Sequence, residues 1–331
     1  MKAFLNPRRI IAAFVARYCT WLPESLFLRI RYQLLMGKRL NLKKPSTFNE
    51  KIQWLKLHDR KPIYSIMVDK LLVKEYISNK IGEEYVIPTL GCWDKFDDIN
   101  FALLPNEFVL KSSNGGGGNG VIICKDKKMF DYAKAKKVLE LSLQSDASKM
   151  QGEWVYKDIK PRIIAERLIK DTSSMDLKDY KFFCFNGKVR CFKIDFGRFE
   201  EHHANYYDPQ GNVLYFGETL CPPVFDHHLQ MPTNLPLMIK LAEKISDGHI
   251  FLRVDLYNVD SKIYFGECTF YPNAGFGPFI PEEWDQKLGE YIQLSTALRK
   301  DAASYVTDLG GGKIATLICI NFGRKEVRLC A

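Results

Sequence analysis

The pattern of apolar and polar positions predicts a chain that begins with helices and continues mainly with antiparallel strands. Apolar residues recur at helical spacing in the stretches 46–55, 63–80, 131–144 and 232–248. Short runs rich in β-branched and aromatic residues, typical of strands, occupy 85–90, 107–111, 121–124, 162–168, 179–185, 189–196, 251–257 and 262–267. The Asn186-Gly187 pair between two of these runs is a strong type I′ hairpin signal. The pattern therefore predicts an α+β protein with antiparallel sheets.

Two of the predicted helices have a recognisable end or face. Ser46 or Thr47 is placed to cap the helix over 46–55. In the helix over 232–248, Leu237, Leu241 and Ile245 share a common face. The helix over 63–80 is expected to run without a break up to Gly82.

The N-terminal segment combines basic and apolar residues. Arg8 and Arg9 precede the apolar run 10–15, and Arg17 interrupts it well before the ~20 apolar residues that cross a bilayer. The segment 8–31 predicts a basic helix broken near Pro23, and no signal-peptide cleavage site is evident. Two interpretations stay open: a helix that lies on an anionic membrane surface, or a helical arm packed on the protein's own body.

Composition agrees with a folded protein of two or three lobes, because 331 residues exceed the usual size of one domain. Nine cysteines without a CxxC pair indicate a reducing compartment and argue against a zinc ribbon or a disulfide framework. The formal net charge of +9 admits nucleic acid, anionic lipid or an acidic substrate as partner. We expect this excess to be spread along the chain rather than concentrated in one block.

Two motifs indicate which ligands the protein binds. Lys111, at the end of a predicted strand, leads into the glycine run 115–118, and a cation beside bare backbone N–H groups suits phosphate. Asp255 and Glu267 fall on two strands joined by a turn at 258–261, which places their carboxylates on adjacent strands. Paired carboxylates suit Mg²⁺, a hard cation that prefers oxygen ligands. Together the motifs predict a site for ATP and Mg²⁺.

Five motifs in this order carry a resemblance to a known superfamily: Phe48-Asn49-Glu50-Lys51, Asp69-Lys70, Asp179-Tyr180-Lys181-Phe182-Phe183, Arg253-Val254-Asp255-Leu256-Tyr257 and Phe265-Gly266-Glu267. With them, the elements over 63–272 resemble the ATP-grasp superfamily, and in particular its TupA-like branch. The resemblance implies an ATP-grasp fold, in which two α+β lobes with antiparallel sheets clamp ATP. The expected regions are an N-terminal helical arm (1–45), a helical region (46–105), a lobe with the glycine loop (106–165), a lobe with the metal site (166–298) and a C-terminal tail of unassigned role (299–331).

The resemblance also implies which residues hold the nucleotide. Lys111 is similar to the lysine that binds the phosphates, together with Gly115, Gly116, Gly117 and Gly118, and Lys70 to an accessory phosphate lysine. The segment Glu166-Arg167-Leu168 resembles the inter-lobe segment that pairs with adenine, and Asp179 the residue that accepts hydrogen bonds from the ribose. Plainer alternatives stay open: a loose hairpin loop for the glycines, a solvated helix residue for Lys70 and exposed strand residues for Glu166 and Asp179.

Asp255 and Glu267 resemble the magnesium ligands of the superfamily, with a surface ion-pair role as the alternative. Many members place asparagine two positions after the second ligand, whereas this chain has Thr269 there and Asn273 further on. We therefore expect Thr269 as a ligand and name Asn273 as a candidate, although a hydroxyl is a weaker ligand than an amide oxygen.

Arg253 and Lys181 are the expected catalytic residues. Arg253 shares a strand face with Asp255 and is placed to stabilise a transferred phosphoryl group, with a structural ion pair as the alternative. The TupA-like branch is associated with teichuronopeptide and other cell-surface polysaccharides. The resemblance thus implies an ATP- and Mg²⁺-dependent ligase that activates a carboxylated sugar or surface-polymer precursor as an acyl phosphate and joins it to an amino acid or peptide amine. Its expected location is the cytoplasm, at the inner face of the cytoplasmic membrane.

Other classes of function remain as alternatives. A glycosyltransferase of polysaccharide biosynthesis fits the association with surface polymers, but Asp255 and Asp260 are too far apart for a DxD motif. A noncatalytic membrane-surface module is a further alternative, and no nucleic-acid partner is expected because an RNA-recognition signature is absent. Gly310–Lys313 resembles a Walker loop, but Ile314 stands where Ser or Thr should coordinate magnesium.

Overall fold

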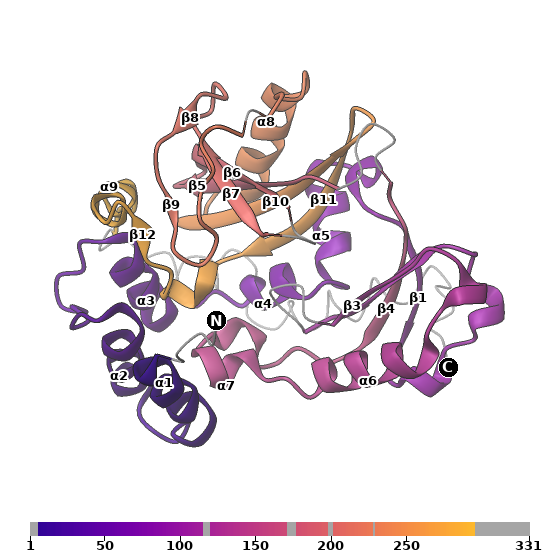
Figure 1. The fold of residues 1–331 in the computed structure, drawn as a ribbon, viewed down its shortest axis with the longest axis horizontal. Coiled ribbons are helices and arrows are strands. Elements are labelled where there is room, and N and C mark those ends of the chain that lie inside the picture. Colours follow the sequence, from indigo (N-terminus) through magenta and orange to yellow (C-terminus); the bar gives the residue numbers. More distant parts are fainter. Residues whose placement is uncertain (1–5, 115–119, 171–176, 198–200, 228, 295–331) are drawn as a thin grey trace, which may run out of the picture.

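The computed structural model describes residues 6–114, 120–170, 177–197, 201–227 and 229–294. Two antiparallel sheets and a group of N-terminal helices make up this part of the chain (Figure 1). The helices are α1 (Pro7–Tyr18), α2 (Glu24–Met36), α3 (Phe48–His58), α4 (Ile63–Val68), α5 (Val73–Ile81), α6 (Tyr132–Leu143), α7 (Ala147–Gln151), α8 (Leu235–Ser246) and α9 (Glu283–Tyr291). Short 3₁₀ turns lie at Glu83–Tyr85, Phe96–Asp98, Phe101–Leu103, Lys127–Met129, Trp154–Tyr156 and Pro272–Gly275.

The smaller sheet, sheet A, has four strands in the order β1-β4-β2-β3. Its strands are β1 (Thr89–Trp93), β2 (Phe108–Ser112), β3 (Val121–Cys124) and β4 (Ile163–Arg167). Alternate residues of β2 and β4, such as Leu110 and Ala165, form a core with Leu139 of α6, so the other face of the sheet points away from that helix. The predicted hairpin of β2 and β3 is confirmed. The strand predicted over 85–90 is wrong in its bounds, because Tyr85 ends a 3₁₀ turn and pairing starts at Thr89.

The larger sheet, sheet B, has six strands in the order β11-β10-β5-β6-β7-β8. They are β5 (Asp179–Phe185), β6 (Lys188–Phe196), β7 (His203–Tyr207), β8 (Val213–Leu214), β10 (Phe251–Val259) and β11 (Lys262–Thr269), and a separate pair joins β9 (Gly217–Glu218) to β12 (Phe279–Ile280). The left-handed residues Asn186 and Gly187 form the predicted turn. Helix α8 covers one face of the sheet through Met238, Leu241 and Ile245, whereas Leu237 at the start of the same helix is 41% exposed.

The helix predicted over 63–80 is interrupted after Val68. Asp69 accepts hydrogen bonds from the backbone N–H groups of Leu71 (2.8 Å) and Leu72 (3.2 Å), so its side chain caps a new turn instead of continuing the helix. The predicted cap of the preceding helix is confirmed, since Thr47 accepts a hydrogen bond from Glu50 in a capping box. The break places Lys70 in a turn between α4 and α5, close to the end of β2, whose neighbour Ser113 accepts a hydrogen bond from the Lys70 backbone (3.4 Å).

Polar residues of α3 hold the loop that follows β11. Asn49 donates to Asp285 (2.9 Å) and to the Gly277 carbonyl (3.0 Å), and Gln53 donates to the Gly275 carbonyl (2.7 Å). The fully buried ammonium of Lys56 donates to the carbonyls of Ala274 (2.8 Å) and Gln151 (2.9 Å). The Phe48-Asn49-Glu50-Lys51 motif thus begins a helix that fixes the Pro272–Gly275 turn at the end of the strand bearing Glu267.

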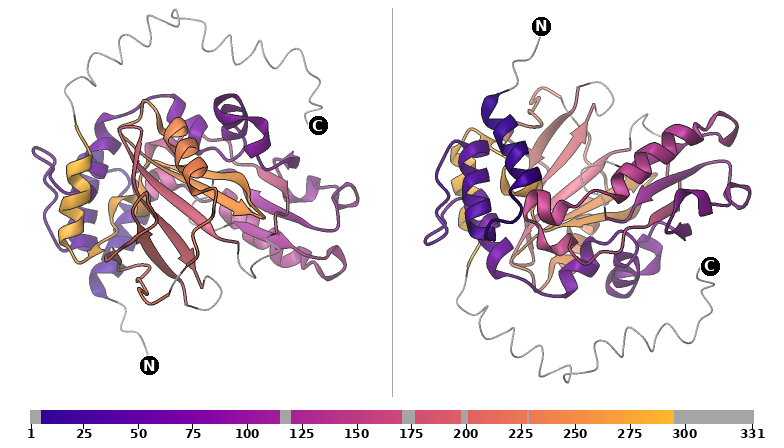
Figure 2. Two further views of the ribbon diagram at one scale, coloured as in Figure 1. Left: turned by 90° about the horizontal axis from the view of Figure 1, so that it is seen from above. Right: turned by 90° about the horizontal axis from the view of Figure 1, so that it is seen from below.

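Helices α1 and α2 pack against each other at one end of the molecule, and sheet A lies at the other end (Figures 1 and 2). Their contact includes Val15 of α1 and Leu28 of α2, in a cluster that also reaches Phe276. The predicted break near Pro23 is confirmed. Among the described residues, no helix has the length and apolar character needed to span a membrane. The seven cysteines in the described ranges are free thiols.

Candidate active site

Lys111 and Glu166 lie on the face of sheet A that points away from α6. The Lys111 ammonium is 2.5 Å from one Glu166 carboxylate oxygen, and Lys74 of α5 is 2.8 Å from the other. Burial alone would raise the pKa of Glu166, but Lys111 and Lys74 outweigh it and hold this pKa below its usual value. Burial lowers the pKa of Lys74, an effect that Glu166 opposes. One carboxylate thus orients two ammonium groups at the mouth of the glycine loop.

Lys70 lies between the charged residues of the two sheets. Burial lowers the pKa of its ammonium; Glu267 of sheet B opposes this effect most strongly, and Lys111 of sheet A adds to it. The side chain is therefore close to both groups, although the sequence predicted it in the middle of a helix. Gly115, Gly116, Gly117 and Gly118 lie outside the described residues.

Asp255 and Glu267 lie on adjacent paired strands, as the sequence predicted, and the strand register sets them opposite each other. Arg253 makes a two-pronged contact with Asp255, with Nε 2.7 Å from Oδ1 and Nη2 2.6 Å from Oδ2, and the same Nη2 lies 2.9 Å from Glu267. Burial raises the pKa of Asp255 to about 7, with Arg253 opposing this rise and Asp179 and Glu267 adding to it. The two carboxylates are close enough to share one cation, which in this structure is the guanidinium.

A row of charged residues continues from this pair across the sheet. Lys181 of β5 stands opposite Asp255, and its ammonium lies 3.1 Å from Asp179 and in hydrogen-bond contact with Asp195 of β6. Although burial lowers the pKa of Lys181, the carboxylates of Asp179, Asp195 and Asp255 raise it above its usual value. Lys181 is therefore a permanent cation beside the Asp255–Glu267 pair.

The row ends in a cluster that the sequence analysis missed. Lys193 of β6 stands opposite Lys181 and lies 2.9 Å from Glu218 of β9. Glu218 also accepts hydrogen bonds from the Tyr206 hydroxyl (2.6 Å) and from the Asn273 side chain. Asn273, a candidate metal ligand, is thus engaged with Glu218, whereas Thr269 stands opposite Arg253 on β11. The alternation of Lys193 and Asp195 on β6 was the available signal, since both share a strand face.

The two sides of the site differ in charge. The sheet A side has three cations and one carboxylate: Lys70, Lys74, Lys111 and Glu166. The sheet B side has five carboxylates and three cations: Asp179, Asp195, Glu218, Asp255, Glu267, Lys181, Lys193 and Arg253. A cationic surface suits phosphate oxygens, and a surface with excess carboxylates suits a metal cation. The arrangement therefore suits a phosphate–metal complex held between the sheets.

The expected adenine segment is the end of β4. Arg167 is exposed, and its backbone N–H donates to the Pro88 carbonyl (3.1 Å), so this group is already bonded within the protein. Ile123, which is 46% exposed, shares a sheet face with Val109 and Glu166 through strand pairing. This face offers an apolar surface next to the charged one. Leu168 is half-buried immediately after β4.

Asp195 also belongs to a group of potential metal ligands with His202 and Cys221, whose ligand atoms lie within 4.8 Å of one another. The Lys181 ammonium contacts the same Asp195 oxygen that faces His202. A second cation there would be repelled by that ammonium, and we assign no metal to this group.

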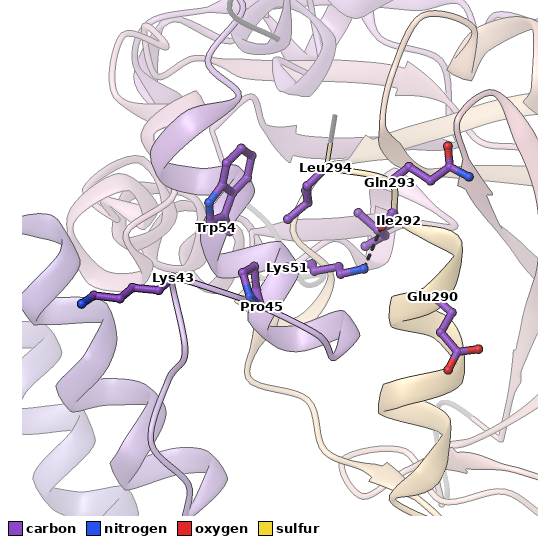
Figure 3. A pocket seen from close by; sticks show the side chains of 8 residues that line it. All are labelled: Lys43, Pro45, Lys51, Trp54, Glu290, Ile292, Gln293 and Leu294. Carbon is purple, nitrogen blue, oxygen red and sulfur yellow. Dashed lines mark hydrogen bonds between the residues drawn. The ribbon is translucent and has the colours of Figure 1, made fainter. Parts of the chain in front are cut away.

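A surface pocket of about 580 Å³ lies elsewhere, between α3 and the segment after α9 (Figure 3). It is lined by Lys43, Pro45, Lys51, Trp54, Glu290, Ile292, Gln293 and Leu294. The Lys51 ammonium donates to the backbone carbonyls of Gly289 and Ile292, both at 2.8 Å. Its lining residues include none of the charged residues described above, and Lys51 acts there as a structural donor that holds α9.

We predict that Gly266→Val weakens the binding of Mg²⁺–ATP by roughly tenfold or more. A bulge at Gly266 shifts the register of β10 and β11, and only this shift sets Glu267 opposite Asp255. A Cβ at Gly266 would lie 3.0 Å from the Asp255 carbonyl oxygen and 3.1 Å from the Tyr257 ring, so a branched side chain must move β11. The control is Lys262→Val at the exposed start of the same strand. Equal affinities of the two variants, measured by calorimetry, would contradict the role of the bulge.

The two antiparallel sheets, with clustered lysines on one and paired carboxylates on the other, agree with a protein of the ATP-grasp class. A model of the TupA-like ATP-grasp family matches residues 50–293, and the chain belongs to this family. This match confirms the resemblance stated from the motifs, the expected fold class and the expected class of enzyme, an ATP-grasp ligase. No curated protein sequence matches the chain significantly.

Several solved structures are similar in fold. D-alanine–D-alanine ligase from Helicobacter pylori shares 14% identity over 70% of this chain and 64% of its own, with a TM-score of 0.38. The corresponding ligase from Bacillus anthracis shares 18% over 72% and 69%, with a TM-score of 0.39. A RimK domain ATP-grasp protein from Sphaerobacter thermophilus shares 11% over 71% and 70%, with a TM-score of 0.39. The chain thus spans just under two thirds of the Helicobacter enzyme, and these similarities are weak beside the family match.

Proposed function

We propose that the chain is an ATP-dependent carboxylate–amine ligase that activates a carboxylate as an acyl phosphate. The observation that supports this most is the juxtaposition of a lysine-rich surface on sheet A with a carboxylate-rich surface on sheet B, bridged by Lys70. Such a pair of surfaces can hold a polyphosphate and its metal ion at once.

Nucleotide binding is assigned to sheet A and its neighbours. Lys111, Lys74 and Lys70 contact the phosphates, and Glu166 releases Lys111 when a phosphate oxygen replaces its carboxylate. The base lies against the apolar face that includes Ile123 and pairs with backbone groups of Glu166-Arg167-Leu168 other than the Arg167 N–H, which already donates to Pro88. Gly115–Gly118 cover the phosphates from the loop after β2. Asp179, held in place by Lys181, binds the ribose.

The residues of sheet B fit a magnesium ion. Asp255 and Glu267 supply carboxylate oxygens, the preferred donors of Mg²⁺, and their shared contact with the Arg253 guanidinium shows that they can jointly surround a cation. Thr269 adds a hydroxyl at the neighbouring register position. When bound, the ion would neutralise the charge that develops on the transferred phosphoryl group.

Arg253 and Lys181 act on the reacting groups. A carboxylate oxygen of the substrate attacks the γ-phosphorus, the bond to the β–γ bridging oxygen breaks, and ADP leaves. Arg253, released from Glu267, and Lys181 stabilise the negative charge of the transferred phosphoryl group. An amine then attacks the acyl carbon, phosphate departs, and the nitrogen loses a proton to give the amide.

The family resemblance supports a carboxylated sugar or surface-polymer precursor as the carboxylate and an amino acid or peptide as the amine. We also propose a cytoplasmic location, in agreement with the free thiols of the seven described cysteines. The substrate assignment is supported by the family resemblance, and the location by the free thiols. The charged site supports the ATP-dependent step.

The test incubates the purified chain with ATP, Mg²⁺, a panel of hexuronic acids and mixed amino acids, and follows nucleotides and products by mass spectrometry. We expect ADP, phosphate and one amide, with hydroxamate formation when hydroxylamine replaces the amine. A carboxylate labelled with ¹⁸O should transfer one labelled oxygen to phosphate. Sugar transfer from a nucleotide donor without ATP consumption would refute the ligase and favour the glycosyltransferase.

A further inference from the structure

Helix α1 has two apolar faces, of which only one packs on the protein. Ala12, Val15 and Ala16 are buried against the neighbouring helices. Ile10, Ile11, Phe14 and Tyr18 are between 50% and 59% exposed. At 3.6 residues per turn these four positions form one stripe about 100° wide, on the side opposite the buried face. The buried face agrees with the interpretation of a helical arm packed on the protein, and the exposed face is available to a partner.

Aromatic residues dominate the exposed stripe and the turn that follows it. The Phe14 and Tyr18 rings lie with centroids 4.9 Å apart, and Trp21 after the helix is 78% exposed. Such rings, apolar with a polar edge, favour the interface between lipid and water. Half or more of the surface of each of these side chains is exposed in the described part of the chain.

The charge excess of the chain is concentrated in its first 45 residues, and the expectation of an even distribution is wrong. Residues 1–45 contain ten lysines and arginines and one acidic residue, an excess of nine that equals the excess of the whole chain. Arg8, Arg9 and Arg17 are exposed on α1 itself, and the Arg17 guanidinium lies 5.9 Å from the centre of the Tyr18 ring. An apolar aromatic stripe flanked by Arg17, on a helix whose other exposed charged residues are arginines, complements an anionic lipid bilayer.

We propose that the exposed face of α1, with Trp21, docks the protein on an anionic membrane surface. The helix lies in the plane of the interface, with Ile10, Phe14 and Trp21 among the acyl chains and the arginines at the lipid phosphates. Figures 1 and 2 show α1 at the end of the molecule opposite sheet A, so docking there leaves sheet A and α6 away from the bilayer. This inference does not depend on the proposed reaction.

The test is flotation of the full chain with vesicles of phosphatidylcholine containing 30% phosphatidylglycerol, and with vesicles of phosphatidylcholine alone. We expect binding to the anionic vesicles that falls with added salt. The triple variant Ile10→Ser, Phe14→Ser, Trp21→Ser should bind roughly tenfold more weakly or worse. The matched control replaces Leu103 and Met129 by serine, both more than 80% exposed and outside the α1 region, and should bind as the wild type does.

Three results would overturn the proposal: no binding of the wild-type chain to anionic vesicles, equal binding by the triple variant, or a dimer in light scattering that the triple variant abolishes while vesicle binding stays absent. Thermal unfolding and Mg²⁺–ATP binding of each variant verify that it is folded. A chain that docks on vesicles but fails to bind ATP would refute the proposed function and leave the docking surface intact.

Discussion

Replacing Lys111 by alanine is expected to weaken ATP binding by roughly 30- to 150-fold, or about 2–3 kcal/mol. A charge-assisted contact with a phosphate oxygen contributes about this much, and the loss of Lys111 also leaves one Glu166 oxygen without its partner. The Glu166 carboxylate would then be paired only with Lys74 and would repel the phosphates. Calorimetric titration with ATP in the presence of Mg²⁺ measures the change directly.

The control for this prediction is Lys136→Ala. Lys136 is also paired with a carboxylate, Asp97 at 2.7 Å, but it lies on α6, on the far side of sheet A from Lys111. Its removal should leave ATP affinity unchanged. Equal affinities of Lys111→Ala and the wild type would refute the assignment of the phosphate site.

Replacing Glu267 by glutamine is expected to reduce turnover by at least about 100-fold, or ~2.7 kcal/mol in the activation barrier. Glu267 is the better test of the metal pair because its side chain is 36% exposed, whereas that of Asp255 is 2% exposed and forms the two-pronged contact with Arg253. Asp255→Asn would leave a buried guanidinium without its main partner and endanger the fold. ADP release in the presence of substrates gives the turnover.

Glu243→Gln is the control for the metal pair. Glu243 lies on α8 and forms a peripheral ion pair with Lys188, with a distance of 2.8 Å between the charged atoms. Binding of Mn²⁺, followed by its electron paramagnetic resonance, reports on the metal site without any substrate. Undiminished Mn²⁺ binding and turnover in Glu267→Gln would show that the ion, if required, lies elsewhere.

Local signals identified most of the elements because the chemistry of the turns is unambiguous. Asn186 and Gly187 adopt the left-handed conformation that their hairpin requires, and the residues on either side form β5 and β6. The position of Asp255 and Glu267 on neighbouring strands followed from the length of the turn between them. Motifs and alternation were therefore sufficient for the fold class and for placing these two carboxylates on adjacent strands, whereas their opposition depends on the bulge at Gly266.

The register of the sheets could not be derived in the same way, because bulges depend on contacts across strands. Counting outward from the Asn186-Gly187 turn would set Lys181 opposite Phe192, but a bulge after Phe183 sets it opposite Lys193. This shift brings Lys193 and Asp195 onto the charged face. Similarly, Asp69 within an apolar helical pattern gave no sign that its side chain would cap a new turn and so move Lys70 toward Glu267.

The Phe48-Asn49-Glu50-Lys51 motif shows a second limit. It marked the family but not its own role, which is to anchor α3 to distant parts of the chain. Asn49 donates to the Asp285 carboxylate and the Gly277 carbonyl, and Lys51 donates to the carbonyls of Gly289 and Ile292 at the end of α9. A buried amide that satisfies a loop more than 200 residues away leaves no local pattern in the sequence.

The central claim is that sheets A and B grip the same Mg²⁺–ATP complex, and the Mg²⁺ dependence of ATP affinity tests it most directly. Calorimetric titrations of the wild type, Lys111→Ala and Glu267→Gln are compared with excess Mg²⁺ and with a chelator. We predict that Mg²⁺ strengthens ATP binding in the wild type and in Lys111→Ala, and that this strengthening is lost in Glu267→Gln, whose affinity without Mg²⁺ is not reduced. An Mg²⁺ effect in Glu267→Gln as large as in the wild type would contradict the account.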